Sequence, residues 1–196
     1  MNKFILFSVM VFAGAFAMAQ TSTTDEGVVI DGVKWATRNV DKPGTFAARP
    51  ESPGMLYQWG SNVGWTYHDP LLSSDGETDW KFYGSDADIW ENSNNVCPEG
   101  WRIPKPGELT MLVNSGSKWT YGGRTFGNDE NNIFLPAVGL RNSASSALFR
   151  SGSFGYYWSN ATRDKYALHL YFGESIITPA DSGQRTSGFS VRCVAK

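Results

Sequence analysis

The sequence predicts a strand-rich domain in which short β-strands and tight turns surround one helix. Glycine accounts for 21 of the 196 residues and aromatic side chains for 14%, a composition typical of many short strands joined by sharp turns. Short apolar runs recur along the chain, separated by segments that contain glycine or proline. A single stretch carries the apolar spacing of an amphipathic helix.

The first twenty residues, MNKFILFSVMVFAGAFAMAQ, have the pattern of a secretory signal peptide. Lys3 precedes an apolar run that ends near Phe16, and the small residues that follow favour cleavage before Gln20. We therefore expect residues 1–19 to be removed. The alternative is a membrane anchor, but the apolar run is shorter than the ~20 residues of a spanning helix. We expect no membrane span after cleavage, and a secreted or cell-surface protein, with the periplasm as an alternative.

Length and charge limit the classes of partner. The formal net charge is −2, and the chain lacks the basic footprint of a nucleic-acid-binding protein, so we expect no nucleic-acid partner. The length without the signal suits one domain with a core of its own. We expect the polar residues 20–27 to form a flexible leader and residues 28–196 to form a single domain.

The first predicted element is a β-hairpin. The apolar runs VVI and VKWATRNV flank Asp31-Gly32, a pair typical of two-residue hairpin turns. A loop rich in proline and glycine follows over residues 41–54. MLYQWG, residues 55–60, is the next strand candidate.

Residues 61–96 form a long, irregular and acidic segment. Aromatic residues are interleaved with its carboxylates, among them Trp65, Trp80 and Trp90. Aromatic side chains of this size favour burial. We therefore expect the segment to fold onto the body of the domain.

Part of this acidic segment resembles a calcium loop in its spacing. Asp75, Glu77 and Asp79 place carboxylates at alternate positions, but the glycine and glutamate that an EF-hand requires are missing. A solvated acidic loop is the simpler interpretation. A calcium site of another type between Asp75 and Glu91 is the alternative, and we expect no other cofactor.

The predicted helix follows the stretch CPEGWRIPKPGEL. Pro106 suits the first turn, where a missing N–H costs nothing. Leu109, Leu112 and Val113 share one helical face, and residues 114–116, Asn-Ser-Gly, end the helix.

Cys97 and Cys193 are the two cysteines of the chain. An even pair in a protein bound for an oxidising compartment favours a disulfide. Closing so long a loop contributes roughly 4–5 kcal/mol on the chain-entropy model. Two free thiols, one of them catalytic, are the alternative, although neither cysteine lies beside a histidine or in a CxxC motif.

The segment from Leu148 to Ser182 has the composition of an adaptable recognition surface, rich in tyrosine, serine, asparagine and arginine. Part of it must be core, and we expect burial of four apolar residues: Trp158, Leu168, Leu170 and Phe172. We predict that the outward side chains bind a ligand: Tyr156, Ser159, Asn160, Thr162, Asp164, Tyr166 and His169. A β-rich core is the alternative explanation of the aromatic residues.

The sequence carries no motif of a known catalytic or metal site. His68 and His169 are the two histidines, and neither has a second histidine or a cysteine at ligand spacing. His169 alternates with Leu168 and Leu170, so we expect it on the opposite face of a strand, at the surface. Nucleophile-elbow, P-loop and dinucleotide-binding motifs are absent. We therefore predict no catalytic residues and no metal ligands.

Six stretches, in this order, resemble a known family: VKWATRNV, YQWG, CPEGWRIPKPGEL, FLPAVGLRN, GYYWSN and GFSVRCV. The family is the Fibrobacter succinogenes major paralogous domain, found in secreted and surface proteins of Bacteroidetes-type bacteria. The resemblance covers about residues 28–196. It implies an α+β, C-type lectin-like domain with a twisted antiparallel sheet, one or two helices and long irregular loops. It also implies that Cys97 pairs with Cys193.

The chain departs from the better-known branches of that fold. The calcium-dependent sugar motifs of true C-type lectins are absent, and Trp158-Ser159-Asn160 is a partial match only. The related formylglycine-generating, sulfatase-modifying group uses reactive or copper-binding cysteines, whereas here both cysteines are assigned to the bridge.

The expected function is that of a secreted, non-catalytic binding module for a carbohydrate or a protein on a cell surface or matrix. The resemblance extends to variable proteins that retroelements diversify near the C-terminus, and the predicted ligand residues lie in that region. A structural or surface-assembly subunit is one alternative. An enzyme of the sulfatase-modifying type or a wall hydrolase is another.

Overall fold

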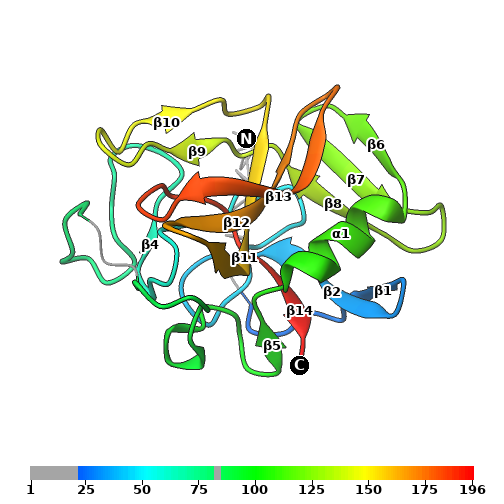
Figure 1. Ribbon diagram of the computed structural model, residues 1–196, viewed down its shortest axis with the longest axis horizontal. Helices are drawn as coiled ribbons and strands as arrows, with labels where there is room; N and C mark the ends of the chain where they lie inside the picture. Colours follow the sequence, from blue (N-terminus) through cyan, green and yellow to red (C-terminus); the bar gives the residue numbers. More distant parts are fainter. Residues whose placement is uncertain (1–21, 82–84) are drawn as a thin grey trace, which may run out of the picture.

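The computed structural model describes residues 22–81 and 85–196 of the chain (Figure 1). The signal peptide predicted for residues 1–19 lies outside the described residues. Small antiparallel sheets and one α-helix make up the described part, so the strand-rich class is confirmed. Within the described residues, no helix has the length and apolar character needed to cross a membrane.

A four-stranded sheet contains both the first and the last strand of the described chain (Figure 1). Its order is β1-β2-β14-β5, with β1 at Val28–Ile30, β2 at Val33–Asn39, β14 at Arg192–Ala195 and β5 at Trp101–Arg102. Asp31 and Gly32 both have positive φ, as the turn between β1 and β2 requires. The hairpin predicted from this Asp-Gly pair is confirmed.

Two three-stranded sheets carry most of the remaining strands. One has the order β11-β12-β13, with bounds Gly155–Arg163, Tyr166–Phe172 and Ile177–Gln184. The other has the order β6-β7-β8, with bounds Ser117–Thr120, Gly123–Gly127 and Asn132–Pro136. Two short pairs complete the fold: β3 (Leu56–Tyr57) with β4 (Gly64–Trp65), and β9 (Leu140–Arg141) with β10 (Leu148–Phe149).

The helix α1 spans Pro106–Asn114, where the sequence predicted it. Glu108 fixes its first turn, because one carboxylate oxygen accepts the Lys105 backbone N–H at 2.7 Å. The same carboxylate forms two hydrogen bonds with the Arg102 guanidinium, at 2.8 and 2.5 Å. Leu109 and Leu112 are buried and pack into the cluster that α1 shares with all three larger sheets.

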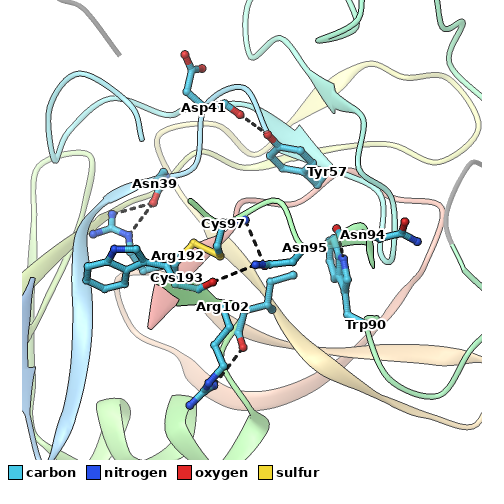
Figure 2. Close-up of a disulfide and its surroundings, with 12 residues drawn as sticks. Asn39, Asp41, Tyr57, Trp90, Asn94, Asn95, Cys97, Arg102, Arg192 and Cys193 are labelled. Carbon is cyan, nitrogen blue, oxygen red and sulfur yellow. Dashed lines mark hydrogen bonds between the residues drawn. A yellow bond between two sulfur atoms is a disulfide. The ribbon is translucent and has the colours of Figure 1, made fainter. Parts of the chain in front are cut away.

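The Cys97–Cys193 disulfide is confirmed (Figure 2). It joins the segment before β5 to the last strand, β14, across 96 residues of sequence. Asn95 orders the chain beside it: its side-chain amide donates to the Trp101 carbonyl at 3.0 Å and its side-chain oxygen accepts the Cys97 N–H at 3.3 Å. The stiff stretch that starts at Cys97 therefore links the start of α1 to the end of the chain.

A buried polar network lies next to this disulfide in β14. The Arg192 guanidinium is fully buried and donates to the side-chain oxygen of Asn39 at 2.7 and 3.0 Å. It also donates to the carbonyls of Ala36 and Phe134. The Asn39 amide donates to the Tyr157 hydroxyl at 3.3 Å, so the network links β2, β8, β11 and β14. Burial lowers the pKa of Arg192 to about 10.

The acidic segment folds onto the body, as its aromatic residues predicted. Trp65 and Trp90 are buried, and the Trp80 indole N–H donates to the Ser143 carbonyl at 3.1 Å. Residues 22–27, the described part of the expected flexible leader, are also hydrogen-bonded to β2. The Asp25 carboxylate accepts hydrogen bonds from the backbone and hydroxyl of Thr37 and from Arg38.

Removing the disulfide tests its share of the stability. We expect the Cys97→Ala/Cys193→Ala variant to lose roughly 4–5 kcal/mol of unfolding free energy, because the unfolded chain regains the entropy of an open loop of this length. Urea unfolding of the oxidised protein and the variant measures the difference. The reduced wild-type protein is the control and should match the variant. Equal midpoints for oxidised protein and variant would contradict the expectation.

Candidate functional site

The seven residues predicted to bind a ligand all lie in the β11–β12 hairpin, but the structure divides them by exposure. Tyr156, Ser159 and His169 are 6%, 0% and 2% exposed, so the expectation that they face outward is wrong. The four residues predicted for the core are buried, as expected: Trp158, Leu168, Leu170 and Phe172.

Both faces of this hairpin are covered, which explains the error. Tyr156 and Trp158 pack into one buried cluster, whereas Tyr157 and Leu170 pack into the other. Alternation along a strand separates inside from outside only when one face meets water. Here it separates two halves of the core.

His169 occupies an aromatic pocket on the inner side of the hairpin. Its ring lies 4.8 Å from that of Phe189 and 5.7 Å from that of Trp158, measured between ring centroids. Gly183, on the neighbouring strand β13, leaves room for it, since a Cβ there would lie 3.1 Å from the imidazole. The nearest carboxylate oxygen, on half-exposed Asp181, is 4.0 Å away. Burial lowers the pKa of His169 to about 4, so the ring is neutral at pH 7.

Asn160 and Thr162 are half-buried because the acidic segment covers this part of β11. The Asn160 carbonyl accepts the Trp90 N–H at 2.8 Å. The hydroxyl and backbone N–H of Thr162 both donate to the Asp88 carbonyl, at 3.0 and 3.2 Å. These two predicted ligand residues are therefore only partly accessible, and their hydrogen bonds attach the acidic segment to β11.

Asp164 and Tyr166 are exposed, at the tip of the hairpin, and a hollow of about 420 Å³ opens beside them. Tyr166 is 37% exposed, and the Lys165 ammonium lies 5.3 Å from the centroid of its ring. We call this hollow the tip hollow. The residues that line it are Asp86, Lys165, Tyr166, Gln184, Arg185 and Thr186.

Arg185 holds the walls of the tip hollow in place. Its guanidinium donates to the carbonyls of Ser85 and Ala87 at 3.1 and 2.9 Å, and to the Asp164 carbonyl at 3.1 Å. It lies 5.0 Å from the ring centroid of Trp59, which is buried beneath. The acidic segment, the hairpin tip and the turn after β13 are thus fixed before any ligand arrives.

Three charged residues of this hollow were not predicted from the sequence as site residues: Asp86, Lys165 and Arg185. Lys165 had a local signal, since it follows Asp164 in the turn between two predicted strands. Arg185 reaches the hairpin tip at Asp164 across 21 residues of chain, and Ala87, next to Asp86, across 98 residues. No short pattern in the sequence specifies such contacts.

In the segment whose spacing resembles a calcium loop, the first carboxylate, Asp75, forms hydrogen bonds with the residues that follow it. The Asp75 carboxylate accepts the backbone N–H groups of Glu77 and Thr78 at 3.1 and 3.0 Å, and the Thr78 hydroxyl. Hydrogen bonds from Thr78 lower the pKa of Asp75 well below its usual range. Over residues 22–81 and 85–196, no three histidine, cysteine or acidic residues converge in a group that could hold a metal ion.

Comparison of the chain with protein-family models, with curated proteins and with solved structures finds no match.

The neutral state of His169 makes the stability of the domain depend on pH. The unfolded chain takes up a proton near pH 6.5, but the folded protein does so only near pH 4. The unfolded state binds more protons between these values, so the free energy of unfolding falls as the pH is lowered through this window, by about 3 kcal/mol from this group.

Chemical unfolding at pH 7 and pH 4.5 measures this loss. His169→Phe keeps an aromatic ring in the pocket and should lose markedly less stability over the same interval. His68→Gln, which changes the exposed histidine, is the matched control and should behave like the wild type. An equal loss in wild type and His169→Phe would contradict the assignment.

Proposed function

We propose that the protein is a secreted, non-catalytic binding module that recognises a glycan or a surface protein at the tip hollow. The observation that carries the proposal is the composition of this hollow. An exposed tyrosine stands among two cations, a carboxylate and an amide, on walls that Arg185 holds in place. Tyrosine supplies contact area at low entropy cost, and charged and amide groups supply directional hydrogen bonds.

The confirmed disulfide supports the secreted or surface location in this proposal, since such bonds persist in oxidising compartments. Kinship with the Fibrobacter succinogenes major paralogous domain, and with it a C-type lectin-like fold, is also part of the proposal. Two features support it: the first and last strands of the described chain share one sheet, and a disulfide joins the segment before β5 to the last strand, β14.

The absence of catalysis is likewise proposed. His169 has a strongly lowered pKa, so its ring is neutral at pH 7. Aromatic rings enclose it, and a substrate cannot reach it in this conformation. Ligand recognition, in contrast, requires only the exposed side chains of the tip hollow.

A binding screen tests the proposal. The oxidised mature protein is applied to arrays of glycans and cell-surface proteins, with and without EDTA. We expect Tyr166→Ala to weaken a hit by about tenfold or more, the usual effect of truncating a central aromatic contact. Met111→Ala, which truncates an exposed residue of α1, is the control and should bind as the wild type does.

Other outcomes discriminate between functions. Loss of the hit in EDTA would point to calcium in the acidic segment. No hit from folded, oxidised protein, combined with self-association at low concentration, would favour a structural or assembly subunit. Turnover of any arrayed compound would favour an enzyme.

We further propose that, if retroelements diversify this region, variation is confined to the exposed part of the hairpin. Thr162, Asp164 and Tyr166 can change without opening the core, whereas Tyr156, Ser159 and His169 cannot. Resequencing the locus across a population measures this. We expect codon variation at the first three positions and constancy at the last three, and uniform codons throughout would rule out diversification.

A further inference from the structure

A second hollow, of about 520 Å³, lies at the other end of the β11–β12–β13 sheet. The tip hollow lies where Tyr166 pairs with Gln184, whereas the second hollow lies beyond the pair Phe172 and Ile177. Three turns surround it: the β6–β7 turn, the turn before β11 and the β12–β13 turn, which lie close together in Figure 1. We call it the aromatic hollow, after Trp119, Tyr121 and Phe154, which line it.

Backbone hydrogen bonds fix two of the three turns to each other. The Ala137 N–H donates to the Gly122 carbonyl in the β6–β7 turn, at 2.7 Å. The Ala137 carbonyl accepts the Gly152 N–H from the turn before β11, at 2.8 Å. Ala137 thus holds the β6–β7 turn and the turn before β11 at a fixed separation through its backbone N–H and carbonyl.

Arg124, in β7, fixes the third turn. Its side chain is 6% exposed, and it donates to the carbonyls of Gly173 and Glu174 at 2.9 and 2.7 Å and to the Ser117 hydroxyl at 3.0 Å. The turn itself is closed by a bond from the Gly173 N–H to the Ile176 carbonyl, at 2.9 Å. The hollow is therefore formed in advance, and a ligand loses little free energy in ordering it.

Two of the aromatic walls are also held by packing. Phe154 stacks on Tyr171, with ring centroids 5.4 Å apart and planes 8° apart, and the Arg150 guanidinium lies 5.0 Å from its centroid. Trp119 meets Phe172 edge to face at 6.5 Å. Tyr121, in contrast, is fully exposed at the rim, and it is the one wall that makes no ring contact among the described residues.

The charges around the hollow select the class of ligand. The exposed carboxylate of Glu174 offsets the attraction of the Arg124 and Arg150 guanidinium groups for an anion. The guanidinium groups of Arg124 and Arg150 already lie over Trp119 and Phe154, so these rings are poor sites for a second cation. A neutral ligand remains.

The uncharged rings and the polar groups that line the hollow suit a ligand that is apolar on one face and carries hydroxyl groups at its edge. The aromatic rings offer apolar surface. Ser153, Ser175 and Glu174 offer hydroxyl and carboxylate oxygens that exchange hydrogen bonds with hydroxyl groups. The volume lies in the range of small-molecule sites. We propose that the aromatic hollow is a binding site for a neutral sugar ring that needs no metal ion.

This site uses no residue of the tip hollow, so it stands or falls separately from the proposed function. The test titrates the oxidised protein with neutral hexose oligosaccharides, followed by calorimetry, in the presence of EDTA. We expect millimolar or tighter binding that Tyr121→Ala weakens about tenfold. Tyr121→Phe, which keeps the ring, should bind nearly as the wild type does.

Two further comparisons keep the outcome clear. Met111→Ala, which truncates an exposed residue of α1 outside both hollows, should leave sugar binding unchanged. Oligosaccharides of the same length made of uronic acids or of amino sugars should bind about tenfold more weakly than the neutral ones. Absence of binding by every neutral oligosaccharide, binding that Tyr121→Ala leaves unchanged, or preference for a charged sugar would each overturn the proposal.

Discussion

The buried Arg192 guanidinium is the constraint on which the rest of the structure depends. It is fully enclosed, and its partners are neutral oxygens: the Asn39 side chain and the carbonyls of Ala36 and Phe134. A buried charge is tolerated only when its hydrogen bonds are complete, and a lost partner leaves the cation exposed to an apolar interior. β2, β8 and β14 must therefore meet in one arrangement. The adjacent Cys193 then ties that arrangement to Cys97, in the segment before β5.

Three other arginines likewise donate hydrogen bonds to backbone carbonyls of turns and irregular segments. Arg141 donates to the carbonyls of Thr66, Tyr67 and Ser146 and to the Asp69 carboxylate. Arg124 donates to carbonyls of the β12–β13 turn, and Arg185 to carbonyls around the tip hollow. A planar guanidinium presents five donors in a fixed geometry, so it can satisfy several carbonyls that no ladder or helix satisfies. This explains how a chain with long irregular segments still offers pre-formed hollows.

Local signals in the sequence predicted local structure, and they failed where the structure depends on distant pairing. Asp31-Gly32 predicted a hairpin because a two-residue turn needs its own φ angles. The spacing of Leu109 and Leu112 predicted α1. The outward placement of His169 was wrong, because alternation cannot tell a covered face from a wet one. The arginine contacts, and the turns that meet around each hollow, depend on register and on chain closure, which no short pattern records.

The two hollows lie at opposite ends of one rigid element. β12 has seven residues, so roughly 20 Å of strand separates them, too far for one sugar ring to touch both. The ligands proposed for the two hollows are therefore either separate molecules or parts of one extended molecule. His169 sits between them, in the middle of β12, and its burial makes the common scaffold less stable in acid. The groups proposed to face ligands stand at strand ends and in turns, whereas the titrating group lies in the core. Substitutions at either hollow should therefore leave this response to acid unchanged.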